Sequence, residues 1–385
     1  MKHAKLSPSG ASKWLNCPPS ANLEAEFPDT SSDYADEGTE AHALAEILIK
    51  IKRRAITSEE GYTALTGFKA SAKYYTGEML EYCDAYADFV MEVFNEAKAH
   101  TKDAVMIQET EIDLTPWVPE GFGNLDVSII SDRVLFVIDL KYGKGVPVSA
   151  VGNKQLMIYA LGAVNAYEDL YDFDTVKVFI HQPRIDNSSN HTYGVDYLKQ
   201  WAETVLKPGA ALAWEGGGNF EAGEHCKFCK AKPACRAHAK MQLELAAYEF
   251  KEGPLLNEDE IADILNRTSS FKTWLTEVDD YALQEAIKGR KWPGYKLVEG
   301  RSTRKITDAD KALQALIKAG FKADDVQITE LRTITELEKL TGKKQFGVIL
   351  DGLIIKPQGK PTLAPEDDKR PPFNSAEAAA IDFEN

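Results

Sequence analysis

The sequence has no long apolar run and an excess of negative charge, and each feature excludes a class of protein. No stretch reaches the roughly 18 apolar residues of a membrane-spanning helix, and residues 1–8 lack the apolar centre of a secretory signal. Lys and Arg number 45 against 60 Asp and Glu, for a net charge of −15. We therefore expect a cytoplasmic protein without a membrane partner, and one that does not bind nucleic acid through a globally basic surface.

Cysteine is scarce as well. Five cysteines in 385 residues are a poor disulfide framework, and they better suit a set of metal ligands with one spare thiol. Hydrophobic residues make up 44% of the chain, which supplies a buried core and excludes wholesale disorder. The length favours roughly two or three domains.

Hydrophobic spacing predicts helices followed by strands in the first part of the chain. Ser7 caps a short helix that begins at Pro8 and ends before Cys17. Further helices are predicted over residues 37–54, 78–98 and 152–166. Strands are predicted over residues 105–112, 124–130, 133–140 and 175–181, the middle two as a hairpin. This pattern predicts an α/β fold with helices on both faces of a small mixed sheet.

The second part of the chain differs in composition. A long amphipathic helix is predicted over residues 258–288, within a helical connector. A small α/β appendage with helices near 309–319 and 335–340 is expected after it, followed by a disordered tail. The predicted boundaries are 1–240, 241–291, 292–363 and 364–385.

A carboxylate and a lysine lie at the end of the apolar strand 133–140. Asp139 and Lys141 lie two residues apart, so the period of a strand places both side chains on one face. Asp126 belongs to the partner strand, just after Gly123, whose lack of a side chain would let backbone or substrate come close. Two converging carboxylates can hold Mg²⁺ or Mn²⁺ beside a lysine that steadies a developing anion. The arrangement predicts phosphodiester hydrolysis; the alternative is an ordinary surface salt bridge.

Two helical pairs accompany this strand. His42 and Glu46 are spaced i,i+4 on one predicted helix, and Gln155 and Tyr159 are so spaced on another. An imidazole can complete a metal shell, while Gln and Tyr can bond a phosphate or stack on a base. The alternatives are a satisfied helix histidine and an ordinary partly buried pair.

The order of these residues resembles a nuclease pattern. The four segments are Gly38-Thr39-x-x-His42, Gly123-Asn124-Leu125-Asp126, Asp139-Leu140-Lys141 and Gln155-x-x-x-Tyr159. In this order they resemble the RecB-type branch of the PD-(D/E)XK nuclease superfamily. The resemblance implies a restriction-endonuclease-like core over residues 1–240, with a helical insertion at about 50–101.

The resemblance also implies a role for each residue. The ligands of the catalytic Mg²⁺ or Mn²⁺ would be His42, Asp126 and Asp139, with the Leu140 carbonyl as a further ligand. Lys141 would be catalytic, and Gln155 and Tyr159 would support the DNA or the lysine. Glu109, on the first strand, could assist a second metal.

The cysteines supply a separate resemblance. Cys17 precedes the nuclease motifs, and Cys226, Cys229 and Cys235 follow them, as in the iron–sulfur staple of part of this branch. Four thiolates suit a [4Fe–4S] cluster or tetrahedral zinc by count. Only one C-x2-C pair is present, which favours a structural cluster over zinc; His225 and His238 would be the substitute ligands of a zinc site. Cys83 lies in an apolar helical stripe and is expected to be a core thiol.

Further segments, together with the cysteine pattern, resemble a family encoded in phages and prophages: Leu6-Ser7-Pro8-Ser9, Gly300-Arg301-Ser302-Thr303-Arg304-Lys305 and Ile354-Ile355-Lys356-Pro357. That resemblance implies a bacterial host cytoplasm and a role in phage DNA replication or recombination, with single-strand-binding, polymerase or helicase proteins as partners. Arg184, Arg301 and Arg304 are candidate DNA contacts, although charge runs are also typical of solvated faces.

These observations predict a metal-dependent DNA nuclease that acts as an exonuclease on DNA ends or single strands. The alternative is a DNA-binding or assembly module of a phage replication complex with a nuclease fold and little or no catalysis. A third possibility is a zinc-stabilised scaffold.

Overall fold

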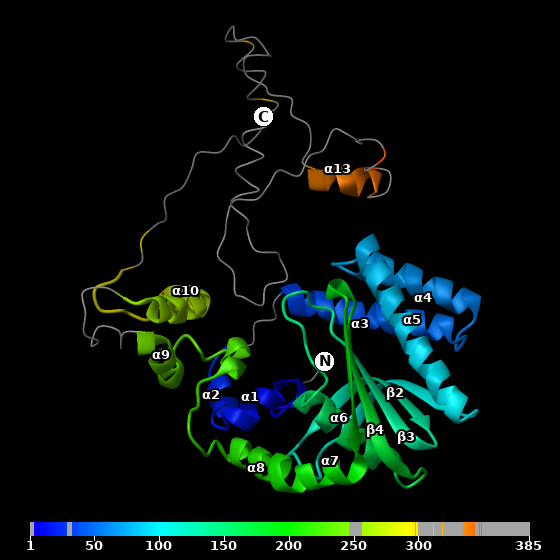
Figure 1. Ribbon diagram of the computed structural model, residues 1–385. Helices are drawn as coiled ribbons and strands as arrows, with labels where there is room; N and C mark the ends of the chain where they lie inside the picture. Colours follow the sequence, from blue (N-terminus) through cyan, green and yellow to red (C-terminus); the bar gives the residue numbers. More distant parts are fainter. Residues whose placement is uncertain are drawn as a thin grey trace. The chain divides into compact units, whose positions relative to one another are not determined.

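The computed structural model describes residues 4–28, 33–245, 256–296 and 334–342, together with the single positions 298, 311, 318, 346 and 348. The chain divides into two compact units, Met1–Ala282 and Leu283–Asn385. The first unit contains a sheet and the helices that cover it (Figure 1).

The sheet has five strands in the order in which they occur along the chain. They are β1 (Val105–Asp113), β2 (Phe122–Ser131), β3 (Arg133–Leu140), β4 (Phe173–Gln182) and β5 (Asn187–Gly194). Neighbouring strands are antiparallel except β3 and β4, which are parallel and joined through helix α6 (Lys154–Tyr167). The four predicted strands are confirmed. The edge strand β5 is not predicted from the sequence, because its residues are almost all polar.

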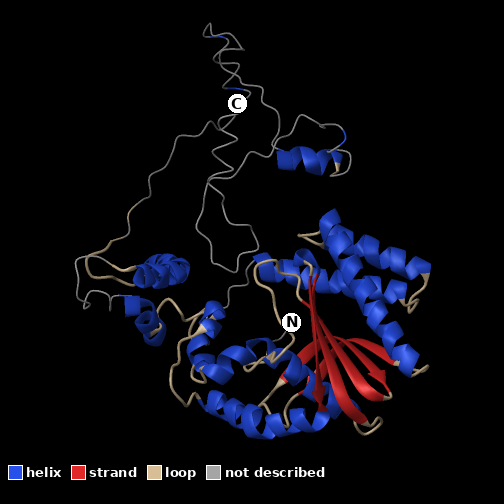
Figure 2. Cartoon of the chain, in the orientation of Figure 1, coloured by secondary structure: helices blue, strands red, loops and turns tan. Residues whose placement is uncertain are grey.

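Helices cover both faces of the sheet, as the sequence predicts (Figure 2). On one face lie η1 (Pro8–Gly10), α1 (Ala11–Asn16), α6, α7 (Val195–Trp201) and α8 (Lys207–Glu215). A π-helical turn, Ala202–Leu206, joins α7 to α8. On the other face lie α3 (Asp33–Lys52) and α5 (Gly77–His100), with α4 (Ser58–Ser71) packed on α3.

Strand β3 contributes side chains to both hydrophobic cores. Leu135 and Val137 belong to the core under α6, and Phe136 and Ile138 belong to the core under α3 and α5. This alternation confirms the prediction of a central strand that is apolar on both faces. Cys83 is fully buried in the second core, where its thiol donates to Ala41 O at 3.4 Å, which confirms it as a core thiol.

The helices begin where side chains cap them. Ser7, Thr76 and Asn153 accept hydrogen bonds from the backbone N–H groups three residues further on, at the starts of η1, α5 and α6. Because Asn153 fixes the first turn of α6, it also fixes Gln155 at the end of the sheet.

The rest of the first unit is helical. It contains α2 (Ser20–Glu24), η4 (Glu224–Phe228), α9 (Arg236–Leu243) and most of α10 (Glu258–Ile287). The long helix predicted over residues 258–288 is therefore confirmed. It packs back on the unit through the Lys232–Glu277 ion pair at 2.6 Å and the Phe27–Tyr281 ring contact.

In the second unit the structure describes α13 (Ile334–Thr341), which matches the helix expected near residues 335–340. The helix expected near 309–319 and the tail 364–385 lie outside the described residues, apart from positions 311 and 318. None of the helices in the described ranges is long and apolar enough to cross a membrane.

Candidate metal centre

Three side chains from three elements gather their ligand atoms at the end of the sheet. His42 of α3, Glu109 of β1 and Asp126 of β2 each offer a nitrogen or an oxygen, and these atoms lie within 4.8 Å of one another. The Nδ1 atom of His42 is 3.2 Å from Oδ1 of Asp126. Carboxylate oxygens suit Mg²⁺ and Mn²⁺, and an added imidazole favours a transition metal such as Mn²⁺ over Mg²⁺. The donor set therefore fits a hard divalent cation.

Glu109 reaches this group through an unusual backbone. It stands opposite Asp126 in the antiparallel register, because Gln108 pairs with Val127 and Thr110 pairs with Leu125. Its φ angle is 47°, in the left-handed region that costs a non-glycine residue about 1 to 2 kcal/mol. Backbone strain of this kind is concentrated at functional sites.

Asp139 and Lys141 share a second network on the side of α6. Lys141 Nζ lies 2.9 Å from Asp139 Oδ2 and donates to Gln155 Oε1 at 2.8 Å. Gln155 Nε2 in turn donates to Asp139 Oδ1 at 3.2 Å and is 3.4 Å from the Tyr159 hydroxyl. The prediction that Asp139 and Lys141 share a face is confirmed, since both contact the same glutamine.

Asp126 connects the two networks. Its Oδ1 faces His42, and its Oδ2 accepts a hydrogen bond from Leu140 N–H at 2.8 Å. The N–H and C=O of one strand residue point to the same side of the strand. The Leu140 carbonyl, predicted as a metal ligand, therefore faces the β2 side, where Asp126 lies.

The structure groups Glu109, rather than Asp139, with His42 and Asp126. Asp139 instead faces the second network, where Lys141 Nζ lies 2.9 Å from its Oδ2 and Gln155 Nε2 donates to its Oδ1. Asp139 borders the group and does not belong to it.

The charges of the centre act strongly on one another. Burial alone would lower the pKa of His42, but the Asp126 carboxylate raises it to about 9. Burial alone would raise the pKa of Asp126, but the charge and hydrogen bond of His42 hold it below its usual value. Desolvation, followed by the charge of Asp126, raises the pKa of Glu109 to about 7. Burial raises the pKa of Asp139, which Lys141 only partly offsets.

A glycine lets two other groups approach the strand that carries Asp126. A Cβ atom at Gly123 would lie 2.9 Å from Pro8 Cγ and 2.9 Å from Tyr159 Cε1. The groups that approach Gly123 are thus the side chains of Pro8 and Tyr159, whereas the sequence leads us to expect backbone or substrate there.

Arg184, predicted as a DNA contact, has a nearly buried side chain that contacts Glu37 and Tyr142. Its guanidinium is 3.0 Å from the Glu37 carboxylate and 4.5 Å above the Tyr142 ring. These contacts tie the start of α3 to the segment after Lys141. Arg301 and Arg304 lie outside the described residues.

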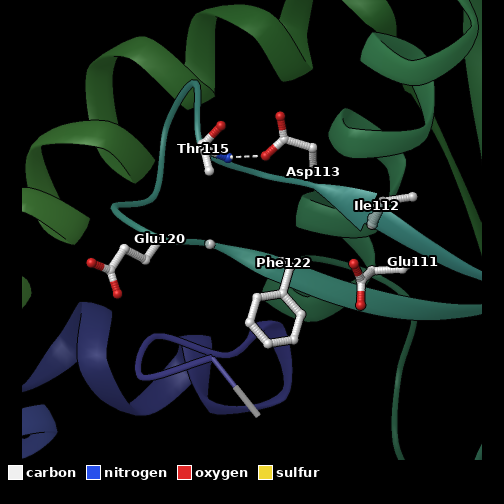
Figure 3. A pocket seen from close by; sticks show the side chains of 7 residues that line it. Glu111, Ile112, Asp113, Thr115, Glu120 and Phe122 are labelled. Atoms are coloured by element: carbon white, nitrogen blue, oxygen red, sulfur yellow. Dashed lines mark hydrogen bonds between the residues drawn. The ribbon is translucent and has the colours of Figure 1, made fainter. Parts of the chain in front are cut away.

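A pocket of about 520 Å³ opens at the β1–β2 turn (Figure 3). Glu111, Asp113 and Glu120 line it together with Ile112 and Phe122. Asp113 accepts a hydrogen bond from Thr115 N–H at 2.9 Å, which closes the turn. With three carboxylates, this pocket repels phosphate.

The N-terminal segment packs against the cysteine loop, although more than 200 residues separate them. Lys230 N–H donates to Glu24 at 2.7 Å, and Lys13 approaches Phe228 O at 3.5 Å. Burial raises the pKa of Cys226, and the nearby Cys17 and Cys235 add to it. Cys229 follows Cys226 by one turn, with its N–H bonded to Cys226 O.

The two candidate substitute ligands are directed elsewhere. His225 contacts Glu221 O at 2.9 Å, and buried His238 packs against Trp274 and Gln242.

A family model described as protein of unknown function (DUF2800) matches residues 3–371. The chain belongs to this DUF2800 family. One solved structure, the crystal structure of SSO0001, matches 59% of this chain and 96% of its own length at 15% identity and a TM-score of 0.24. Similarity at that level carries no inference about the DUF2800 chain.

Sequence spacing does not reveal some of the residues that build the centre. Glu37 and Arg184 lie 147 positions apart, and neither belongs to a motif. Gln182, which is buried and bonds the segment after Lys141, is likewise not assigned. The only sequence signal for Gln182 is a polar residue at the end of an apolar strand.

Proposed function

We propose that this protein is a Mg²⁺- or Mn²⁺-dependent deoxyribonuclease that hydrolyses phosphodiester bonds. The observation that carries the proposal is the position of the His42–Glu109–Asp126 group beside a lysine held by Asp139 and Gln155. A hard cation next to a fixed ammonium is the arrangement that phosphoryl chemistry needs. The resemblance to RecB-type nucleases supports the same activity.

The cation would be held by His42, Glu109 and Asp126, with the Leu140 carbonyl and Asp139 next to them. When bound, it would supply Lewis-acid activation of a water and neutralise phosphate charge. The Leu140 N–H holds Asp126 in place for this role.

Lys141 is the group that we assign to the developing charge on the phosphate. The Lys141 ammonium donates to Gln155 Oε1 and lies 2.9 Å from Asp139 Oδ2. An ammonium has three donors, and the lysine side chain is 29% exposed, so it can also reach a substrate oxygen. Gln155 orients both Lys141 and Asp139, and Tyr159 packs behind it.

We further propose that Cys17, Cys226, Cys229 and Cys235 bind a structural [4Fe–4S] cluster. The contacts between residues 13–24 and 228–230 support this proposal, because they bring the first cysteine to the other three.

The substrate we propose is DNA ends or single strands, with phage replication or recombination proteins as partners. The test is cleavage of end-labelled single- and double-stranded DNA by the anaerobically purified full chain with Mg²⁺, Mn²⁺ or EDTA. Metal-dependent release of nucleotides from an end supports an exonuclease, and internal cuts in circular DNA would indicate endonuclease action. DNA binding without cleavage under every metal condition would favour the assembly module.

A further inference from the structure

The segment between Lys141 and α6 is held in place by polar side chains of β4. Gln182 is 2% exposed and bonds the segment twice. Its Oε1 accepts from Val148 N–H at 2.7 Å, and its Nε2 donates to Val146 O at 3.1 Å. One buried amide thus fixes two backbone groups.

Strand β5 continues this clamp at alternate positions along one face. Asn187 donates to Val148 O at 3.0 Å and Ser189 accepts from Ala150 N–H at 3.0 Å. The Tyr193 hydroxyl accepts from Gly152 N–H at 2.8 Å. Residues 148–152 are therefore bonded to the edge strand β5 up to the start of α6, so the polar side chains of β5 hold this segment.

The first residue after Lys141 is fixed from the other side. Tyr142 is 5% exposed and lies under the Arg184 guanidinium, which is itself paired with Glu37. The segment is consequently anchored at residue 142 and again from residue 146.

Between these anchors, Gly143, Lys144 and Gly145 form an exposed tip. Within the described ranges, the Lys144 ammonium has no carboxylate partner, and the three backbone N–H groups of the tip make no hydrogen bond. A Cβ atom at either glycine would meet nothing within 4 Å. The tip therefore offers an ammonium and unpaired N–H donors on a backbone whose two ends are fixed, which suits an anion.

Charge favours DNA on this side of the centre. The β1–β2 turn carries Glu111, Asp113 and Glu120, whereas the segment after β3 carries Lys141 and Lys144. A phosphate backbone that crosses the centre is repelled by the first surface and attracted by the second.

We propose that the Gly143–Gly145 tip binds a backbone phosphate of the DNA strand, next to the phosphate at the metal centre. This inference rests on the proposed nuclease function and adds to it the side from which the strand approaches. The tip contacts phosphate and carries no base preference.

The test measures binding and cleavage of a labelled single-stranded oligonucleotide by full-chain Lys144→Ala and Lys144→Glu. The matched control is Lys102→Glu, an exposed lysine between α5 and β1, at the opposite end of β3 from Lys141. Binding is measured in EDTA at several salt concentrations. We expect Lys144→Ala to weaken binding about fivefold and to reduce the salt slope by about 1, because one phosphate contact is lost. KM should rise while kcat stays close to that of the natural chain.

The outcomes separate the two proposals. If Lys144→Glu binds as tightly as Lys102→Glu with the same salt slope, the tip proposal is wrong, even if the natural chain cleaves DNA. If Lys144→Glu alone binds weakly but the natural chain never cleaves, the tip stands and the nuclease proposal fails. A natural chain that binds no DNA overturns both.

Discussion

Glu109 and Asp126 face each other across β1 and β2, and Glu109 reaches that position with a φ angle of 47°. Two carboxylates in this arrangement repel each other, and the strained backbone adds to the cost. The repulsion is relieved when a divalent cation lies between the carboxylates and His42. A bound cation would therefore remove the repulsion, while the backbone cost at Glu109 would remain.

The first prediction concerns this strain. Glu109→Gly should stabilise the metal-free protein by about 1 kcal/mol, because glycine adopts positive φ freely and one carboxylate is removed. The same change should abolish Mn²⁺ binding. Urea unfolding in EDTA and calorimetric Mn²⁺ titration measure the two effects.

The matched control is Glu111→Gly, two residues further on the same strand. Its backbone is not in the left-handed region, so glycine there should cost about 0.5 to 1 kcal/mol. Equal destabilisation by the two substitutions would show that Glu109 is not strained.

The second prediction is that metal binding releases protons. At pH 7 His42, whose pKa is about 9, is protonated, and Glu109, whose pKa is about 7, is half protonated. A cation must displace these protons, so about one to two should leave per ion. Affinity should therefore rise with pH, by about tenfold per pH unit between 7 and 9. Calorimetry in buffers of different ionisation enthalpy counts the released protons. A metal affinity that does not change between pH 7 and 9 would refute the assignment of His42 as a ligand.

The third prediction separates metal binding from chemistry. Lys141→Ala should keep metal affinity and slow single-turnover cleavage by about 10² to 10³, because an ammonium is not a ligand but faces the phosphate. Gln155→Ala should slow cleavage by only about tenfold, since Lys141 keeps its contact with Asp139. Lys199→Ala, which breaks the exposed Lys199–Glu168 pair, is the control and should change neither quantity. Loss of metal binding in Lys141→Ala would contradict the division of roles.

The fourth prediction concerns the cysteines. Alanine at Cys17, Cys226, Cys229 or Cys235 should remove the bound iron, the visible absorbance near about 400 nm and much of the thermal stability, because each is one of four ligands. Cys83→Ala should retain all the iron and cost on the order of 1 kcal/mol, since this thiol is buried in the core. Stoichiometric zinc without sulfide after anaerobic preparation would overturn the cluster.

The sequence predicts the elements whose apolar residues follow a clear period. Strand β3 is apolar on both faces, and helices α3, α5, α6 and α10 carry apolar stripes, so their predicted ends differ from the observed ones by at most four residues. Strand β5 lacks such a pattern, since Asn187 and Ser189 point toward a loop and bond its backbone. Because these side chains of β5 form hydrogen bonds with the backbone of residues 148–150, this part of the strand carries no apolar residues that a sequence pattern could reveal.

The site is predictable only in part for similar reasons. Motif order selects His42, Asp126 and Lys141. Glu109 joins the ligand group because its own backbone adopts a left-handed conformation, which no sequence pattern predicts. Arg184 has the charge of a DNA contact, yet it is paired with Glu37, far away in the sequence. Such contacts are set by tertiary structure alone.

The most direct test of the central claim compares Asp126→Asn with Asp113→Asn in one cleavage assay. Asp126 belongs to the metal group, while Asp113 lies on the neighbouring strand and only lines the acidic pocket. End-labelled DNA is incubated with each full-chain variant in Mn²⁺ and in EDTA. We expect the natural chain and Asp113→Asn to cleave in Mn²⁺ and to be silent in EDTA, and Asp126→Asn to be silent in both. Cleavage by Asp126→Asn at the rate of the natural chain would contradict the account.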